Sequence, residues 1–467
     1  MLLSQLQRHA TRKVGVKAQI AAVRKNGFLR SAGVLVGGTA FAQALAVLAL
    51  PLLTRLYSPE DFSLLAVYVA LLTLVSVIAC LRLEIAIPLP EDDTEAANLL
   101  AIALTLVAVT AAIVAIIVLA FGTAFFDAIG QPKMASYGWL LPPAVLLAGS
   151  YAALQYWATR KKRFPTIART RMMQAASGIT AQVGLGWIGA GALGLMIGHA
   201  LKAGSGVVNL SREALRSDMG PLSGISRIGM LRALGEYRAF PQYSVWEALS
   251  NQAAVQIPML LIAALAVGPE AGFLLLAMRA MGTPVQLVGR AASQVYLSRA
   301  PEEMRRGNLP GFTTEVLSGL ARAGAPIIIF IAIVAPTIFP IVFGEEWRRA
   351  GELVAWMTPW YLLKLLSSPI SMVMHVTMKQ RFMMALMIAT FFVSTGVTLA
   401  AYALHPSLIA IGYALSGMIS YAIALTVYLN VAGVTLRNCM TIARSSGAPV
   451  IIAIMAGVLI SQVLSKI

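Results

Sequence analysis

Apolar runs long enough to cross a membrane recur from one end of this chain to the other. A helix needs about 20 consecutive apolar residues to cross a hydrocarbon core of about 30 Å, and thirteen runs of about 18 to 25 residues meet that requirement. Only 12% of the residues are charged, whereas soluble domains carry about 25%. The sequence therefore predicts an all-α polytopic membrane protein. The runs begin near Ser31, Phe62, Ala97, Gly138, Met172, Gly194, Pro241, Glu270, Glu315, Ala350, Phe382, Pro406 and Ala448.

The basic residues are distributed unevenly between the connections. Most of the 36 Lys and Arg lie in the N-terminal tail or in alternate connections, including the run Arg160–Arg163. Because basic residues accumulate on the cytoplasmic side, we predict a multi-pass plasma-membrane protein with a cytoplasmic N-terminus. This topology, together with contacts to anionic membrane lipids, accounts for the net charge of +17. The charge is not interpreted as nucleic-acid binding.

The predicted spans fall into two groups of six. A basic cytoplasmic tail at 1–29 precedes the first group at 30–211, and a basic cytoplasmic connection at 212–238 leads to the second group at 239–430. Residues 431–467 hold a cytoplasmic loop and an expected thirteenth helix. We therefore predict two pseudo-symmetric six-helix lobes around a central cavity, an arrangement frequent in transporters that work by alternating access.

Two similar helix starts support a duplication. Ser58-Pro59-Glu60 separates spans one and two, and Gly268-Pro269-Glu270 separates spans seven and eight. Proline suits the first position of a helix, and a nearby glutamate complements the helix dipole. We expect a helical hairpin with a Pro-Glu helix start in each lobe.

A row of polar residues follows one face of the eighth predicted span. Arg279, Thr283, Gln286, Arg290 and Ser293 lie within about 80° of arc at 100° per residue. A charged side chain near the bilayer centre costs about 2.5 to 3.5 kcal/mol even on a lenient scale, so such residues face protein or water. A second row, within about 100° of arc, runs through Lys364, Ser367, Ser368, Ser371 and His375.

Cations outnumber carboxylates among these intramembrane groups, which favours an anionic cargo such as a phosphate or pyrophosphate. Arg82 and Glu84 at the end of span two, and Glu247 in span seven, are candidates for an entrance or for ion coupling. The candidate substrate contacts are Arg279, Arg290, Lys364, Lys202, Arg322, Gln286, Asn251 and Trp360.

Two alternative interpretations of these residues stay open. Arg279 and Glu247, on adjacent predicted helices, would form an internal ion pair that only fixes packing. Trp360 and Tyr361 would either stack on sugars or belong, with Trp356, to the aromatic belt at the membrane interface.

The sequence contains no catalytic or cofactor-binding motif in the structural context that such a function requires. Gly184, Gly186 and Gly189 match the G-x-G-x-x-G pattern, but no predicted strand precedes them. The four histidines are scattered, and Cys80 and Cys439 are expected to stay reduced. We predict neither a metal nor a cofactor.

Two segments resemble a known family. Arg55-Leu-Tyr-Ser-Pro-Glu-Asp-Phe62, followed by an apolar helix and Leu81-Arg-Leu-Glu-Ile-Ala-Ile-Pro88, looks like the start of Wzx-type O-antigen and exopolysaccharide flippases. Phe240-Pro241-Gln-Tyr243 is also similar to that family. These flippases share a superfamily with the lipid II flippases and the multidrug and toxin extrusion transporters.

The resemblance implies a mostly twelve-helix transporter of the bacterial inner membrane. Its cargo would be an undecaprenyl-pyrophosphate-linked oligosaccharide, moved to the periplasmic leaflet for surface polysaccharide biosynthesis, with the polysaccharide polymerase machinery as a further partner. The thirteenth span departs from that pattern. A multidrug or cation antiporter of the same fold, and a membrane glycan polymerase or ligase, are the alternatives.

Overall fold

The computed structural model describes residues 27–377 and 379–464. Within these ranges it does not describe the side chains of 27–36, 284, 287, 290, 291, 294, 380, 381, 436 and 445. The predicted tail at 1–29 therefore lies almost entirely outside the described residues. The described part of the chain contains helices and no strand, which confirms the all-α prediction.

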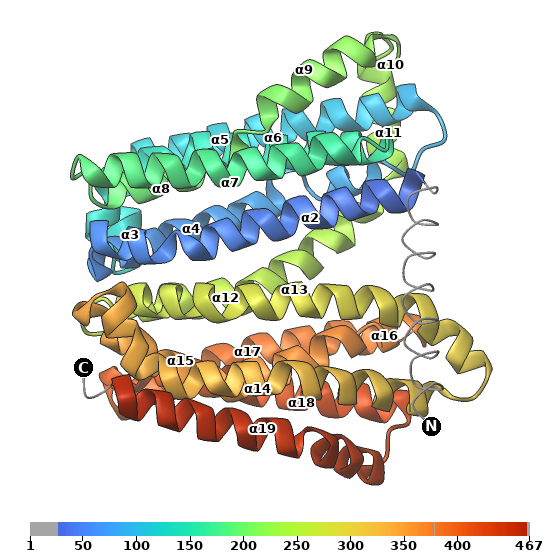
Figure 1. Cartoon of the computed structure of the whole chain (residues 1–467). Helices are drawn as coiled ribbons and strands as arrows, with labels where there is room; N and C mark the ends of the chain where they lie inside the picture. The colour runs from blue at the N-terminus through green and yellow to red at the C-terminus, as the bar shows by residue number, and fades with distance from the viewer. Residues whose placement is uncertain (1–26, 378, 465–467) are drawn as a thin grey trace, which may run out of the picture.

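The helices divide into two lobes, drawn one above the other in Figure 1. The first lobe contains α2 (Gly27–Leu48), α3 (Leu50–Leu56), α4 (Pro59–Ala79), η1 (Leu83–Ala86), α5 (Asp93–Ala128), η2 (Pro132–Leu140), α6 (Leu141–Arg160), α7 (Phe164–Trp187) and α8 (Ala192–Gly204). The connection contains α9 (Val207–Ser217), α10 (Met219–Ser223) and α11 (Arg227–Glu236). The second lobe contains the π-helical turn η3 (Phe240–Ser244), α12 (Val245–Leu265), α13 (Glu270–Arg305), α14 (Leu309–Phe343), η4 (Glu345–Trp347), α15 (Arg348–Ile370), α16 (Val373–Val376), α17 (Gln380–Leu404), η5 (Pro406–Leu408) and α18 (Ile409–Ala432). A further helix, α19 (Leu436–Leu464), follows the second lobe and packs on α14.

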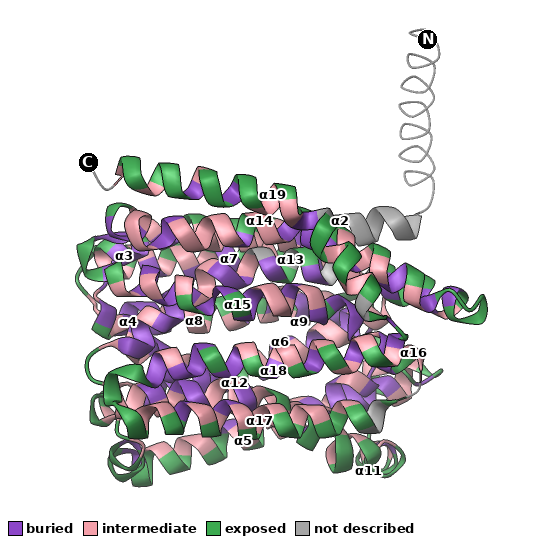
Figure 2. Ribbon diagram, turned by 90° about the horizontal axis from the view of Figure 1, so that it is seen from below, coloured by how far each residue is buried: buried purple, intermediate pink, exposed green. Residues whose placement is uncertain are grey.

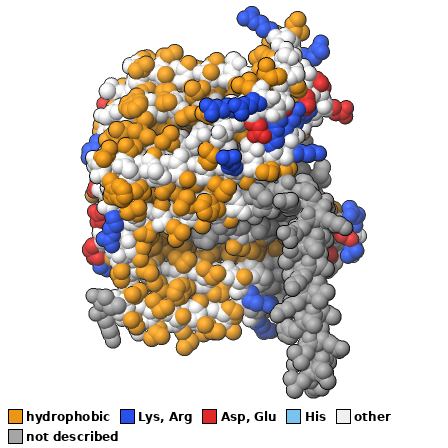
Figure 3. Space-filling model, turned by 45° about the horizontal axis from the view of Figure 1, so that its top comes forward, with side chains coloured by type: hydrophobic (Ala, Val, Ile, Leu, Met, Phe, Trp, Pro, Cys, Tyr) orange, Lys and Arg blue, Asp and Glu red, His pale blue; other side chains and the backbone are white. Residues whose placement is uncertain are grey.

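Nine of the described segments are long and apolar enough to cross a membrane. The remaining predicted spans correspond to α7, α8, α13 and α15; α8 is too short, and the other three contain too many polar or charged residues. The outer helices expose large apolar side chains, such as Leu119 of α5 and Met455 of α19 (Figure 2). Figure 3 shows hydrophobic side chains over the middle of the visible face and charged side chains toward its ends. This distribution fits a protein embedded in a bilayer.

The two predicted helix starts are confirmed. Pro59 is the first residue of α4, and the side chain of Ser58 and that of Asp61 form a capping box around it. In the second lobe, α13 begins at Glu270 directly after Pro269. Both lobes thus begin their second long helices at a Pro-Glu pair, although only the first has a capping box, and the residue boundaries of the lobes stay a prediction.

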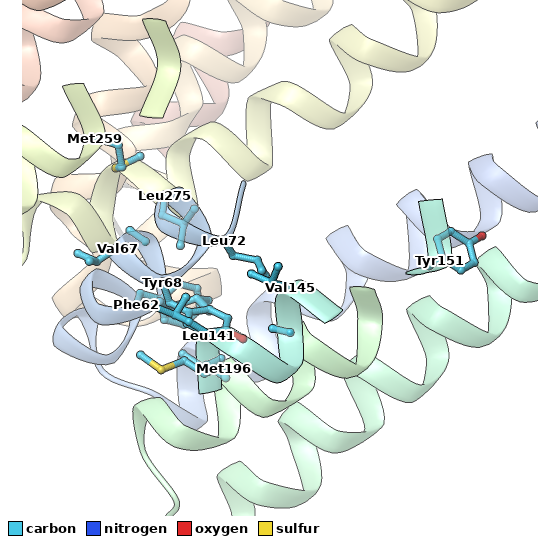
Figure 4. Close-up of a cluster of buried hydrophobic side chains, with 14 of the residues drawn as sticks. Phe62, Val67, Tyr68, Leu72, Leu141, Val145, Tyr151, Met196, Met259 and Leu275 are labelled. Atoms are coloured by element: carbon cyan, nitrogen blue, oxygen red, sulfur yellow. The ribbon is translucent and has the colours of Figure 1, made fainter. Parts of the chain in front are cut away.

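Helix α4 carries most of the contact between the lobes. It packs against both α12 and α13, and Val67 of α4 lies beside Met259 and Leu275 of those helices (Figure 4). Phe62 and Tyr68 of the same helix are fully buried. One continuous apolar core therefore crosses the lobe interface.

One end of this interface, which we call the Trp347 end, is closely packed. Trp347 lies between the rings of Phe62 and Phe273, at centroid distances of 4.8 and 5.9 Å, and its indole donates a hydrogen bond to the carbonyl of Thr54. A Cβ on Gly272 would overlap the carbonyl oxygen of Pro59. Side chains and backbone thus close the interface at this end, which faces the cell exterior in the predicted orientation.

The second polar row is interrupted, contrary to the prediction. Helix α15, which contains Pro369 near its end, stops at Ile370, and the chain turns before the short helix α16. Proline lacks the backbone N–H that helix continuation needs. Lys364 and His375 therefore do not share one helix face.

Candidate functional site

Arg279 lies in a hollow between the two lobes. It shares this space, of about 230 Å³, with Gln43 of α2, Ala66 of α4, and Thr283 and Gln286 of its own helix. A neighbouring space of about 110 Å³ is lined by Gln43, Arg279 and Thr283 again, together with His199 and Lys202 of α8. We call the two spaces the Arg279 hollow. The first polar row predicted from sequence thus faces protein-lined space as far as Gln286.

Arg279 lies far from either end of its helix. Nine residues separate it from Glu270, about 13 Å at 1.5 Å per residue, which is near the middle of a bilayer. No ion pair joins Arg279 or Lys202 to an acidic side chain in the part of the chain that the structure describes. The predicted alternative of an Arg279–Glu247 pair is therefore wrong, because Glu247 lines a different space.

Lys364 lies in an aromatic pocket of about 140 Å³ in the second lobe. Its ammonium nitrogen is 5.3 Å from the ring centroid of Tyr361, 5.8 Å from that of Tyr421 and 5.9 Å from that of Trp360. Ring faces attract cations at about this range. Trp360 and Tyr361 are almost fully buried, so they do not belong to an interfacial belt. Trp356 is about half exposed, as a belt residue would be.

Unpartnered polar atoms also line the Lys364 pocket. The indole nitrogen of Trp360 and the hydroxyl of Ser420 are buried without a hydrogen-bond partner among the described residues. Asn251 lines the same pocket from α12. These groups could donate hydrogen bonds to a ligand, whereas Lys364 supplies its charge.

Arg82, Glu247 and Asn251 line a third space, of about 320 Å³, at the other end of the lobe interface, which we call the Arg82 end. Leu81 and Arg82 have φ values of 48° and 62°, in the left-handed region. That conformation costs non-glycine residues on the order of 1 to 3 kcal/mol and clusters at functional sites. The strained turn is therefore consistent with the prediction that Arg82 is an entrance residue.

Glu84 is buried beside this space. One carboxylate oxygen is 3.4 Å from a guanidinium nitrogen of Arg82, and the other has no hydrogen-bond partner in the described structure. Burial raises the pKa of Glu84 above its usual range, although Arg82 acts in the opposite direction. The Arg82–Glu84 pair is thus formed within the first lobe, while the exposed Glu247 of the second lobe forms no ion pair among the described residues.

The three spaces adjoin one another through shared lining residues. Val255 and Met278 line both the Arg279 hollow and the Lys364 pocket, and Asn251 and Met387 line both the Lys364 pocket and the space at the Arg82 end. A series of hollows therefore leads from Lys202 of the first lobe to Lys364 and Arg82.

Two predicted contacts are not brought into this series. The side chain of Arg290 lies outside the described residues. Arg322 of α14 is exposed, as is Ile327 farther along the same helix. Arg322 lines none of the three spaces. The structure thus groups Arg279, Lys202 and Gln286 in one hollow, and Lys364, Trp360 and Asn251 in the adjoining pocket.

Sequence reasoning missed two residues of these spaces. Gln43 lines both parts of the Arg279 hollow, and a single glutamine within an apolar span was the signal for it. Tyr421 completes the aromatic surroundings of Lys364 from α18, a contact between distant segments that periodicity along one helix does not reveal.

Comparison with known proteins identifies the family. A family model described as polysaccharide biosynthesis protein matches residues 52–352. The chain belongs to this family. The matched region runs from the start of α3 to the start of α15 and includes Arg82, Lys202, Glu247 and Arg279. No curated protein sequence matches the chain significantly.

Solved structures show the fold that this family member shares with known transporters. The lipid II flippase MurJ in an inward closed conformation is similar, with a TM-score of 0.71 at 12% identity, over 92% of this chain and 98% of that one. An inward-facing multidrug resistance MATE family transporter gives a TM-score of 0.59 at 14% identity, over 86% and 95% of the chains. The eukaryotic MATE transporter AtDTX14 gives 0.52 at 17% identity, over 92% and 100%. The predicted bilobed transporter fold is thus confirmed.

Proposed function

We propose that this member of the polysaccharide biosynthesis family is a flippase for a lipid-linked oligosaccharide. The cargo would be an undecaprenyl-pyrophosphate-linked glycan, carried from the cytoplasmic to the periplasmic leaflet of the bacterial inner membrane. The observation that carries the proposal is the position of Arg279 and Lys202. They come from different lobes, line one hollow near mid-membrane and have no acidic partner among the described residues.

Physical reasoning connects this hollow with a pyrophosphate. Coulomb attraction grows as the effective dielectric constant falls, so two cations that line one hollow inside a membrane would stabilise an anion between them. Arginine can also donate two parallel hydrogen bonds to phosphate oxygens. The membrane-embedded prenyl chain would meanwhile stay in lipid, with only the head group entering between the lobes.

Alternating access requires that the hollows change size. Binding sites for drug-sized ligands measure about 300 to 1,000 Å³, and the two parts of the Arg279 hollow, at about 230 and 110 Å³, together only reach the lower limit of that range, whereas an oligosaccharide is larger than such ligands. An oligosaccharide would therefore enter only after the lobes move apart at the Arg82 end. Release would then require opening of the Trp347 end.

Removal of the Arg279 guanidinium tests the proposal. The full-length protein is reconstituted in vesicles with an undecaprenyl-pyrophosphate-linked oligosaccharide, and an impermeant glycosidase added outside measures how fast glycan reaches the outer leaflet. Hydrogen bonds to charged groups contribute about 1.5 to 3 kcal/mol, so we expect Arg279→Ala to lower the initial rate by about 10- to 100-fold. Arg279→Lys, which keeps the charge but loses the paired hydrogen bonds, should give an intermediate rate.

Arg305→Ala is the matched control, because Arg305 is exposed at the far end of the same helix. Its rate should stay within about two-fold of wild type, as expected for an exposed site away from special contacts. Unchanged glycan movement in correctly inserted Arg279→Ala would refute the role of Arg279. Export of a cationic dye by wild-type protein that moves no glycan would favour the antiporter.

The antiporter alternative has weaker support in this chain. A binding site for a cation benefits from carboxylates, because an opposite charge offsets the cost of leaving water. The described residues that line the Arg279 hollow and the Lys364 pocket include no Asp or Glu. Glu247 lines the adjoining space at the Arg82 end.

A further inference from the structure

Helix α9 leaves the first lobe through a bend after α8. Helix α8 ends at Gly204 and α9 begins at Val207. A Cβ on Gly206 would lie 2.5 Å from the ring of Tyr151, so glycine is required for this path of the chain. Figure 1 shows α9 extending away from the bundle on the side far from the second lobe. Asn209 lines a groove between α9 and α7, whereas Lys202 of α8 lines the Arg279 hollow.

This groove has a volume of about 430 Å³ and is lined mainly by basic and polar side chains. Arg169 projects into it from α7, and Arg212 and Arg216 project from α9. Thr166, Asn209 and Ser217 add hydroxyl and amide groups. We call this feature the α7–α9 groove.

The acidic groups around the groove already have basic partners. Asp218 accepts hydrogen bonds from both terminal nitrogens of Arg163, each at 2.8 Å, and from the indole of Trp157 at 2.9 Å. Glu213 lies 3.5 Å from Arg163 and accepts a hydrogen bond from Thr166. Asp93 pairs with Arg160 and Lys161.

Arg169, Arg212 and Arg216 are left without an acidic partner among the residues described. Three guanidinium groups around one groove repel each other unless an anion from outside the chain lies between them. Arginine pairs particularly well with phosphate, to which it donates two parallel hydrogen bonds. The groove therefore favours a phosphate-bearing ligand.

The position of the groove indicates where that phosphate comes from. Helix α9 also exposes apolar side chains, Val208 and Leu215, next to Arg212. A helix with basic and apolar exposed residues fits the boundary between lipid head groups and acyl chains. The groove shares no lining residue with the Arg279 hollow, the Lys364 pocket or the space at the Arg82 end. A lipid of the surrounding bilayer, rather than the transported cargo, matches this location.

We infer that the α7–α9 groove binds the phosphate head group of an anionic phospholipid in the cytoplasmic leaflet. Arg169, Arg212 and Arg216 contact the phosphate, and the acyl chains lie along the apolar side of α9. The bound lipid holds the connection between the lobes against the membrane surface. This inference is independent of the proposed cargo.

Native mass spectrometry of the full-length protein with phosphatidylglycerol and phosphatidylcholine tests the inference. The groove variant combines Arg169→Gln, Arg212→Gln and Arg216→Gln. A control variant combines Arg227→Gln, Arg232→Gln and Arg238→Gln, which remove the same charge from exposed positions of the connection. Wild type should prefer phosphatidylglycerol. Each basic residue near an anionic lipid adds roughly a five-fold preference, so the groove variant should lose at least about ten-fold in affinity and the control less than about three-fold.

Three results would overturn the inference. Equal losses in both variants would show diffuse attraction without a site, and unchanged binding in the groove variant would show that the groove is not used. Tighter binding of undecaprenyl phosphate than of phosphatidylglycerol, lost in the groove variant, would identify a prenyl-phosphate site instead. If the groove variant does not fold, cross-linking of wild-type protein with a photoreactive phosphatidylglycerol tests the inference instead. Cross-links in α7 and α9 support the inference, and cross-links only elsewhere refute it.

Discussion

At the Trp347 end the two lobes meet through packed rings and a glycine, whereas at the Arg82 end they face each other across a hollow. The first end joins the lobes through the packing of Trp347, Phe62 and Gly272, and hydrogen bonds from Trp347 to Thr54 and from Arg55 to Ile341 also cross it. The second holds Arg82 in a strained turn and leaves Glu247 without an ion-pair partner among the described residues. One end is therefore stabilised by close packing, and the other can open with few apolar contacts to break.

This difference suggests how the molecule would alternate. Opening the Trp347 end would expose buried aromatic side chains to water. This exposure costs about 25 cal/mol of free energy per Å² of apolar area. That cost has to be offset by new contacts at the Arg82 end or by the bound cargo. Variants that weaken one end and leave the other intact should therefore shift the balance between the two states.

Trp347→Ala should have the largest effect. Removal of a buried Trp costs about 3 to 5 kcal/mol, and here much of the lost contact is between lobes. We expect spin labels on Lys133→Cys and Glu346→Cys, exposed positions in η2 and η4, to report a larger separation. Double electron–electron resonance measures that distance. An unchanged distance distribution would mean that Trp347 does not hold the lobes together.

Gly272→Ala should have a smaller effect of the same kind. The added methyl group would overlap the Pro59 carbonyl, and overpacking of a tight contact costs about 1 to 3 kcal/mol. The same label pair should show a partial shift toward longer distances. Gly396→Ala is the matched control, because a Cβ there meets no atom within 4 Å. If both variants behave alike, the close backbone approach is not what limits opening.

Glu84→Gln tests the Arg82 end through its pH dependence. Burial raises the folded-state pKa of Glu84 above the unfolded value, so folding favours the protonated form. The wild type should lose stability as pH rises from the usual glutamate pKa to the raised one, and stay level above it. The variant should lack this loss. Thermal unfolding at several pH values measures it, and identical pH profiles would contradict a buried, titrating Glu84.

Glu247→Gln should have the smallest effect. Glu247 is exposed and has no ion-pair partner in the described structure, and substitutions at such sites usually change stability by less than about 0.5 kcal/mol. We expect unchanged unfolding and an unchanged distance at the Trp347 end. A large loss of glycan movement without a loss of stability would instead assign Glu247 to ion coupling.

Hydropathy and local signals predicted the fold well for physical reasons. A membrane imposes length and polarity on each helix separately, so α4 and α14 could be recognised without knowledge of their neighbours. The Pro-Glu starts at Pro59 and Glu270 are similarly local. The break after Ile370 and the bend at Gly206 were not predicted, since they depend on prolines and close contacts between helices.

The candidate site was only partly predictable. Periodicity placed Arg279, Thr283 and Gln286 on one face, because all three belong to one uninterrupted helix. On an unbroken helix, Asn209 would share a face with Lys202 seven residues earlier, but the chain bends between them and the two line different spaces. Periodicity could not pair Lys202 with Arg279 either, since their meeting depends on how two lobes pack.

The aromatic surroundings of Lys364 bear on how a transport cycle could be powered. A free cation in such a cage could dissociate to one side of the membrane and so couple an ion gradient to movement. The nitrogen of Lys364 is covalently attached, so its charge can leave the three ring faces only by moving to an anion or by loss of a proton. Of the ions that could power the cycle, Lys364 itself could therefore carry only a proton.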